Sequence, residues 1–428
     1  MLRLKDHTQN TMKTPSLLLI SCFTLGLLIA APCFPVTAAN STDNDLGWTF
    51  EYDDNGRITH VKDPAARTTQ IKYSFNEDNR LQQLIRTITD GPTIIYKFDE
   101  RGRRSSMTDA ASTVSYGYDD LDRLNRIQRQ GDPVIVYTHD TLDRIRSLQV
   151  GDFYRIEYNY DFLGRMESMK TPVGVIRYEY LTGEGKLLRT LPNGVVTISS
   201  YEPNGELRQI SHGVTRATDD THYTVLAEYR YQYRPDGLIE AIHERSGNSQ
   251  FLHTYLYDKV GRLVNATGPA GQQYTYKYDL VGNRLNAVLA SNTPQNLTYD
   301  WAGRLKGFNG KPVAYDAAGN LVAMTFDDKT LTYRYNSNNK LTEVPEGNVS
   351  YQYDGEGQLI TRKLGNNEVT FMPDPLSDYW QPLVITDKAD HRTMVIWEGS
   401  IPLIMIRDGK PEYLLHDHLG SVRLVLNS

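Results

Sequence analysis

Side chains that could do chemistry are sparse in this sequence. The densest cluster of ionisable residues is His416-Asp417-His418, near the end of the chain. On a strand the two histidines would share one face, but a metal site needs one or two further ligands from elsewhere. The adjoining Leu419-Gly420-Ser421 favours a strand end followed by a turn. We therefore expect no metal, no cofactor and no catalytic residue here.

Motifs for phosphate binding and hydrolysis are missing from the sequence. It contains no G-x-G-x-x-G, no G-x-x-x-x-G-K-[ST], no G-x-S-x-G elbow and no H-E-x-x-H. The two cysteines, Cys22 and Cys33, both lie in the first 39 residues. A mature chain without that segment would have neither disulfides nor thiol chemistry. These observations predict a protein that is not an enzyme.

Residues 1–39 have the pattern of a secretory signal peptide. Basic residues precede an apolar run from Leu17 to Ala31, and Thr37-Ala38-Ala39 offers small residues for cleavage before Asn40. We expect the rest of the chain to be exported to the periplasm, the cell surface or the medium. The alternative is an uncleaved membrane anchor, because the apolar run approaches spanning length. Export follows from either interpretation, since the basic flank stays inside.

A short signature recurs along the chain and decides the predicted fold. It consists of a tyrosine, an aspartate, two variable residues, a glycine and an arginine, and copies are commonly about 21 residues apart. Four copies are Tyr52, Asp53, Gly56 and Arg57; Tyr160, Asp161, Gly164 and Arg165; Tyr257, Asp258, Gly261 and Arg262; and Tyr299, Asp300, Gly303 and Arg304.

Each copy predicts a β-hairpin. Before the turn, aromatic and polar residues alternate, as in Tyr274–Tyr278, which places the tyrosines on one face of a strand. The aspartate can accept a hydrogen bond from the backbone N–H two residues on, and the glycine supplies a positive φ. Asn79 and Asp122 replace that glycine in other copies, and Asn and Asp tolerate this conformation next best. These are therefore predicted to be fold residues rather than catalytic ones.

Stacked hairpins would stabilise one another through nearest-neighbour contacts. The rows of tyrosines would allow edge-to-face ring contacts, while each hydroxyl reaches a polar partner or water. The predicted fold class is all-β, with repeated antiparallel hairpins forming a spiralling, shell-like or solenoid-like sheet. The repeat region runs over residues 46–371, and degenerate repeats follow over 372–428. A net charge of −6 without a basic stripe gives nucleic-acid binding little support.

The recurrent units resemble the YD repeats of bacterial Rhs proteins, teneurins and the C components of insecticidal toxin complexes. The segment Tyr413–Arg423 resembles the start of the Rhs-associated core, whose typical string is matched by Asp417, His418, Leu419, Gly420 and Ser421. The resemblance covers residues 46–423 and implies a long β-sheet that spirals into a hollow shell, which in the larger relatives encloses a C-terminal toxin domain. The family's self-cleavage motif has no match here, because no Asp-Pro pair is followed by its glycine pattern.

Three functions are weighed on this basis. The first is an exported structural or encapsulating shell protein, part of a polymorphic-toxin or cell-surface interaction system, whose partner is a second polypeptide completing the shell or a toxin cargo. The second is a repeat module that binds surface glycans or another cell surface. The third, a toxin or enzyme, has no supporting motif. Burial of the tyrosine rows would favour the first and exposure the second, and a membrane is a partner only if the N-terminal segment is uncleaved.

The C-terminal strand carries a further expectation. Leu424-Val425-Leu426 would place apolar side chains on an open sheet edge, and such edges recruit other strands. We expect this edge to be covered by a second polypeptide or by self-association. The alternative is that the segment from Pro373 to Pro382 folds back over it as a plug.

Overall fold

The computed structural model describes residues 47–427, except 216–222, 290–292 and 327. The predicted signal segment, residues 1–39, lies outside the described residues. Within the described part, strands dominate, and the helical segments are three short 3₁₀ turns, η1 (Thr182–Glu184), η2 (Pro269–Gly271) and η3 (Pro345–Gly347). None of the described helices is long and apolar enough to cross a membrane.

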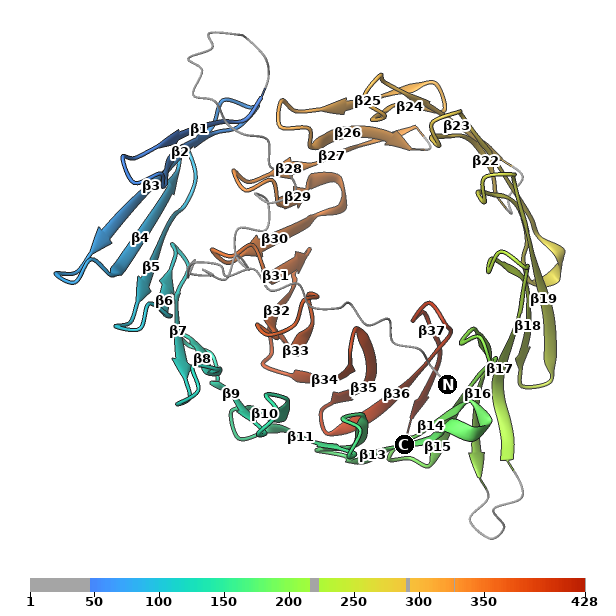
Figure 1. The fold of residues 1–428 in the computed structure, drawn as a ribbon. Coiled ribbons are helices and arrows are strands. Elements are labelled where there is room, and N and C mark those ends of the chain that lie inside the picture. Colours follow the sequence, from blue (N-terminus) through green and yellow to red (C-terminus); the bar gives the residue numbers. More distant parts are fainter. Residues whose placement is uncertain (1–46, 216–222, 290–292, 327, 428) are drawn as a thin grey trace, which may run out of the picture. The chain divides into compact units, whose positions relative to one another are not determined.

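The strands form two sheets, of 27 and 10 strands, in which chain neighbours pair antiparallel (Figure 1). The first sheet contains β1 (Thr49–Tyr52), β2 (Ile58–Lys62), β3 (Thr68–Phe75), β4 (Leu81–Ile88), β5 (Thr93–Phe98), β6 (Arg104–Thr108), β7 (Thr113–Tyr118), β8 (Leu124–Arg129), β9 (Ile135–His139), β10 (Ile145–Val150), β11 (Tyr154–Tyr160), β12 (Met166–Thr171), β13 (Gly174–Leu181), β14 (Lys186–Thr190), β15 (Val195–Tyr201), β16 (Leu207–Thr215), β17 (Tyr223–Tyr233), β18 (Ile239–Ser246), β19 (Ser249–Tyr257), β20 (Leu263–Thr267), β21 (Gln273–Tyr278), β22 (Arg284–Val288), β23 (Pro294–Tyr299), β24 (Leu305–Phe308), β25 (Lys311–Tyr315), β26 (Leu321–Phe326) and β27 (Lys329–Thr332). The second contains β28 (Arg334–Tyr335), β29 (Leu341–Val344), β30 (Val349–Tyr353), β31 (Leu359–Leu364), β32 (Asn367–Pro373), β33 (Pro382–Asp387), β34 (Arg392–Glu398), β35 (Ile401–Arg407), β36 (Lys410–His416) and β37 (Val422–Asn427). The prediction of an all-β fold built from antiparallel hairpins is confirmed.

The tyrosine that opens each signature lies where the strand register shifts. In the β11–β12 hairpin, Tyr160 pairs with Met166, and the shift falls between Asn159 and Tyr160. The same shift occurs at Tyr257 and Tyr299. A β-bulge at this point adds local twist, and its recurrence gives successive hairpins the same bend.

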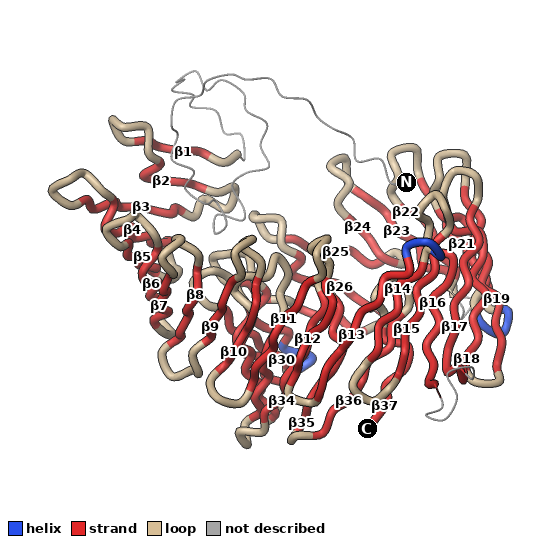
Figure 2. The backbone as a smooth tube through the Cα atoms, turned by 60° about the horizontal axis from the view of Figure 1, so that its bottom comes forward, coloured by secondary structure: helices blue, strands red, loops and turns tan. Residues whose placement is uncertain are grey.

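The second sheet packs against the first in chain order. Contacts between the sheets join Arg67 with Asn339, Arg129 with Asp354, Tyr137 with Asp374, Tyr154 with Val395, Arg189 with Glu398, His212 with His416, and Glu244 with Arg423. The largest buried apolar cluster draws residues from both sheets, among them Ile94, Ile156, Ile176, Leu383 and Ile404. Figure 2 shows β34–β36 beside β10–β15. The second sheet therefore supplies about a third of this buried cluster, and the first sheet supplies the rest.

Most tyrosines in the rows are buried or half-buried. Tyr137 and Tyr154 are each 1% exposed, and Tyr229 and Tyr231 are also buried. The expected edge-to-face contacts between tyrosine rings are not found in the described residues, where the ring contacts pair histidine, phenylalanine or tryptophan with another aromatic side chain. Several tyrosine rings, such as Tyr160 and Tyr180, are covered by arginine side chains instead.

The alternative in which the segment from Pro373 to Pro382 plugs the C-terminal edge is wrong. Pro373 and Pro382 pair with each other where β32 meets β33, and the loop between them lies against Tyr137 of β9. Along its length β37 pairs with β36, and Leu424 and Leu426 pack onto the apolar core. Val425 faces away and is 53% exposed. The segment cannot cover β37 because its hydrogen bonds hold it elsewhere in the second sheet.

Candidate functional site: the repeat turns and the cavity between the sheets

Each signature closes a turn around the carboxylate of its aspartate. Asp161 Oδ1 accepts hydrogen bonds from the backbone N–H groups of Leu163 and Arg165, at 2.9 and 2.8 Å. Its Oδ2 accepts one from Arg165 Nε at 2.7 Å. Gly164 has a φ of 80°, which a side chain would resist. One aspartate therefore fixes both the backbone of the turn and the arginine that leaves it.

The other signature copies have the same geometry. The arginine Nε to aspartate Oδ2 distance is 2.7 Å in the Asp53–Arg57 turn, 2.6 Å in Asp258–Arg262 and 2.7 Å in Asp300–Arg304. Gly56, Gly261 and Gly303 all have positive φ. The hydrogen bond from the backbone N–H of the arginine lowers the pKa of the aspartate in all three turns, so each carboxylate is held in its charged form.

Neighbouring hairpins are linked by contacts that sequence reasoning missed. The guanidinium of Arg144 lies 4.3 Å from the ring centroid of Tyr160, in the next signature, and that of Arg165 lies 4.1 Å from Tyr180. The Tyr160 hydroxyl also donates to the carbonyl of Ile145 at 2.9 Å. The sequence could have indicated these arginine–tyrosine contacts, because an arginine ends one signature and an aromatic residue opens the next.

These links recur along the sheet. Arg262 lies 4.9 Å from the ring of Tyr278, and the hydroxyls of Tyr257, Tyr278 and Tyr299 donate to Ile239, Leu263 and Arg284 carbonyls. Cation–π contacts of this kind contribute about 0.5–2 kcal/mol each. Each signature therefore stabilises its own turn and the strand of its neighbour.

Valine at Gly164 should destabilise the fold by about 1 kcal/mol or more, because φ is positive there. Asparagine should be tolerated better, since Asn79 and Asn339 hold the same conformation in other copies. Denaturant midpoints would measure both changes. Leu163→Val, at an exposed position beside it, serves as the control. Equal midpoints for Gly164→Val and the control would contradict the turn assignment.

The segment Asp417 to Ser421 forms the same kind of turn in the second sheet. Asp417 Oδ1 accepts hydrogen bonds from the N–H groups of Leu419 and Ser421, both at 3.0 Å, and Gly420 has a φ of 79°. The ring of His418 lies 4.7 Å from that of Tyr231 in the first sheet. Leu419 is 78% exposed. The start of the core motif is therefore one more hairpin turn, set against the first sheet.

Two buried histidines lie where β36 meets the first sheet. His212 Nδ1 lies 2.9 Å from Thr197 Oγ1, and its Nε2 lies 2.9 Å from the carbonyl oxygen of His416, both within hydrogen-bond distance. The His416 ring is 4% exposed and makes no hydrogen bond in the described part of the chain. Burial lowers the pKa of both histidines to about 4. Among the described residues, no group of three or more potential metal ligands comes together.

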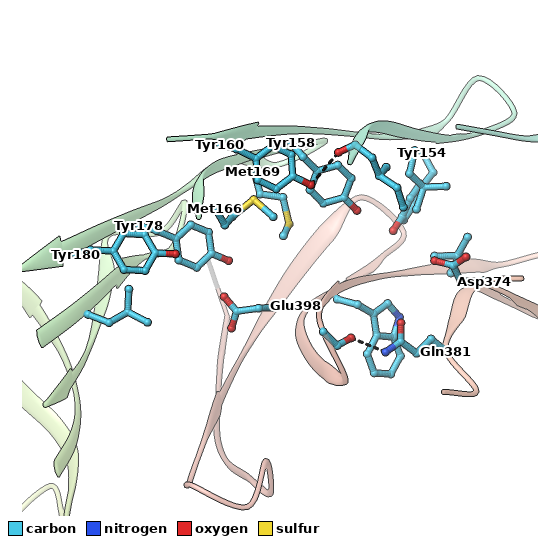
Figure 3. A pocket seen from close by; sticks show the side chains of 16 residues that line it. Tyr154, Tyr158, Tyr160, Met166, Met169, Tyr178, Tyr180, Asp374, Gln381 and Glu398 are labelled. Atoms are coloured by element: carbon cyan, nitrogen blue, oxygen red, sulfur yellow. Dashed lines mark hydrogen bonds between the residues drawn. The ribbon is translucent and has the colours of Figure 1, made fainter. Parts of the chain in front are cut away.

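A cavity of about 420 Å³ lies between the two sheets (Figure 3). It is lined by Ile145, Leu148, Tyr154, Tyr158, Tyr160, Met166, Met169, Tyr178, Tyr180, Leu187, Asp374, Gln381, Leu383, Trp397, Glu398 and Gly399. Its tyrosine wall comes from β11 and β13, and its acidic residues come from the second sheet. Sequence reasoning did not find this cavity, because it depends on how two distant segments pack.

Comparison with known proteins settles the family. The Teneurin YD-shell family model matches residues 41–141 and 220–428, which is more than half of the chain. The chain belongs to the Teneurin YD-shell family. No curated protein sequence matches it. The resemblance to YD-repeat proteins drawn from the signature is thus confirmed.

Solved structures of similar fold are components of toxin complexes. A crystal structure of TcdB2-TccC3-TEV matches with a TM-score of 0.70 and 17% identity, over 89% of this chain and 23% of that one. A structure of the Photorhabdus luminescens Tc holotoxin pore carrying a TccC3 mutation matches with a TM-score of 0.68 and 17% identity, with the same coverage. This YD-shell chain therefore spans less than a quarter of those proteins, and at this identity the likeness establishes the fold.

Proposed function

We propose that this YD-shell protein is an exported structural segment that covers or encloses a polypeptide, in a toxin-associated or cell-surface system. The observation that carries the proposal is the burial of the tyrosine rows under linked hairpins and a second docked sheet. The signature residues have local structural roles, which favours a structural function over a catalytic one. The proposal that the chain is exported rests on the sequence of residues 1–39. We also propose that the rest of the chain divides into a repeat region, 46–371, and a region of degenerate repeats, 372–428.

The partner that fits best is a second polypeptide, either a further piece of shell or a toxin cargo. The similar solved structures are toxin complexes, and this chain covers 23% of the first of them. A glycan-binding surface fits less well, because tyrosines such as Tyr137 and Tyr154 are buried and cannot stack on sugars. Native mass spectrometry of the secreted protein tests the proposal. A particle heavier than one chain, containing a second polypeptide, would support it, while a bare monomer that binds a glycan array would contradict it.

We infer that the repeat turns contribute contacts with such a partner. Phe162 and Trp301 occupy the variable positions of two signatures and are 93% and 97% exposed, and Leu280 and Val281 are also exposed, in the turn after Tyr278. A partner that spans several turns would contact these side chains together.

Replacing Phe162 and Trp301 by serine should therefore weaken association without unfolding the chain. We expect a change in unfolding free energy within about 0.5 kcal/mol, because neither side chain is packed. Light scattering would measure association, and denaturant unfolding the stability. Tyr379→Ser, at an exposed aromatic residue in the loop before β33, is the matched control. An unchanged particle mass in the double variant would contradict the assignment.

A further inference from the structure

The cavity between the sheets has two walls of different chemistry. The first sheet contributes the rings of Tyr154, Tyr158 and Tyr178, with methionine side chains beside them. The second sheet contributes the carboxylates of Asp374 and Glu398. Figure 3 shows the tyrosine rings along one side and the two acidic side chains across from them. An aromatic surface facing a carboxylate suits a ligand that is both apolar and positively charged.

Asp374 lacks a cationic partner in the described part of the chain. Its Oδ1 accepts hydrogen bonds from the Tyr137 hydroxyl at 2.6 Å and from the N–H of Leu376 at 2.9 Å, and both donors are neutral. Glu398, by contrast, forms an ion pair with Arg189. Removing a carboxylate from water is costly unless a cation pairs with it. The charge of the half-buried Asp374 has no such pairing within the described residues.

The uncompensated charge lies close to the tyrosine wall. Burial, and secondarily the negative charge of Asp374, raises the pKa of the Tyr137 and Tyr158 hydroxyls. Burial also raises the pKa of Asp374 itself. A cation bound between Asp374 and these rings would lower the electrostatic cost of this half-buried carboxylate.

Two other tyrosine rings that line the cavity already bind cations of the protein. Arg144 covers Tyr160 and Arg165 covers Tyr180, at 4.3 and 4.1 Å from the ring centroids. Within the described residues no arginine or lysine covers Tyr154, Tyr158 or Tyr178 in this way. These three rings therefore leave aromatic surface free toward the cavity.

We propose that this cavity binds an alkylated ammonium ion, with Asp374 opposite its charge and the rings of Tyr154, Tyr158 and Tyr178 around its alkyl groups. Such an ion needs few hydrogen-bond acceptors, which suits a wall of rings and thioethers, and its methyl groups fit against Met166 and Met169. A volume of about 420 Å³ accommodates a small ligand of this class. The proposal does not depend on the shell function.

Calorimetric titration of the full secreted chain with choline tests the proposal. The neutral isostere 3,3-dimethylbutan-1-ol is the matched ligand, since it has the same shape without the charge. We expect saturable choline binding, and binding of the alcohol that is at least about tenfold weaker. Equal affinities for the two ligands, or no saturable binding of choline, would overturn the proposal.

Two pairs of variants locate the site. Asp374→Asn keeps the hydrogen-bond acceptor at Oδ1 and removes the charge, so choline binding should fall at least about tenfold. Asp378→Asn, in the same loop but exposed, should bind as the unmodified chain does. Undiminished choline binding by a folded Asp374→Asn variant would overturn the proposal.

Tyr158→Phe keeps the aromatic face and should retain choline binding, whereas Tyr158→Leu should lose it by about tenfold. These two Tyr158 variants test the cation site even if Asp374→Asn fails to fold. Thermal unfolding would show which variants are folded. Similar affinities for a native phenylalanine and a native leucine variant would argue against a ring-lined cation site.

Discussion

Asp354→Ala is expected to destabilise the protein by about 3–5 kcal/mol. Asp354 is 8% exposed, and its Oδ2 accepts a hydrogen bond from Arg129 Nη2 at 2.7 Å across the two sheets. Its Oδ1 also accepts hydrogen bonds from the N–H groups of Glu356 and Gln358 within its turn. Removing the carboxylate would leave the Arg129 guanidinium without this buried partner, in addition to loosening the turn.

Asp300→Ala is the control that separates the two contributions. Asp300 makes the same turn hydrogen bonds, but its ionic partner Arg304 is the exposed arginine of its own turn. Its loss should cost about 1 kcal/mol, as for other capping side chains. Equilibrium unfolding in denaturant measures both variants. Similar losses for Asp354→Ala and Asp300→Ala would mean that the ion pair between the sheets contributes nothing beyond the turn.

Acidification is expected to loosen the attachment of β36 and β37. His212 has a folded-state pKa of about 4, below its ordinary value of 6.5, because burial disfavours the charged ring. A base with a lowered pKa contributes stability that is complete above pH 6.5 and is lost progressively as the pH falls from 6.5 toward 4. For His212, which is 1% exposed, that loss is on the order of 3 kcal/mol.

His416 should act in the same direction. Burial and the neighbouring Arg189 lower its pKa, whereas the carboxylates of Asp417 and Glu398 oppose the shift. The turn aspartates titrate in a different window, because their lowered pKa values make their contribution disappear only below about pH 4. Loss of stability between about pH 6.5 and 4.5 would therefore come from the buried histidines.

Hydrogen exchange at about pH 7 and pH 5, corrected for the intrinsic exchange rates, would measure this effect. We expect the amides of β36 and β37 to lose protection at the lower pH, and His212→Phe to reduce the change because it removes the titrating ring. His391→Phe is the control, since His391 is exposed and its hydrogen bond with Asp387 raises its pKa. Unchanged protection of β36 and β37 at pH 5 would contradict the role given to the histidines.

Local sequence information was sufficient for the hairpins. Asp161, Gly164 and Arg165 form a turn whose hydrogen bonds span four residues, so the residue types alone specify it. The same reasoning predicts a turn at Asp417 and Gly420, which the structure confirms. The family resemblance followed from this local signature because it is repeated.

The packing of the two sheets could not be predicted in this way. Arg67 and Asn339, which share a hydrogen bond at 2.8 Å, are 272 positions apart. Nothing in the sequence around either residue indicates that the other lies beside it. The cavity depends on the same packing, because Asp374 meets Tyr137 only when the second sheet docks. The plug over β37 failed for this reason, since nothing local indicated that the loop after Pro373 belongs against β9.

Protease protection of the purified protein tests most directly the proposal that this chain covers a polypeptide. The protein, purified without denaturation, would be treated with protease, and the surviving peptides would be identified by mass spectrometry. If this chain covers a second polypeptide, that polypeptide should survive in the intact complex and be digested faster when Asp354→Ala weakens the contact between the sheets. A second polypeptide that is digested equally fast with the unmodified chain and with Asp354→Ala, or a purified chain that never carries one, would contradict the proposal that this protein covers a polypeptide.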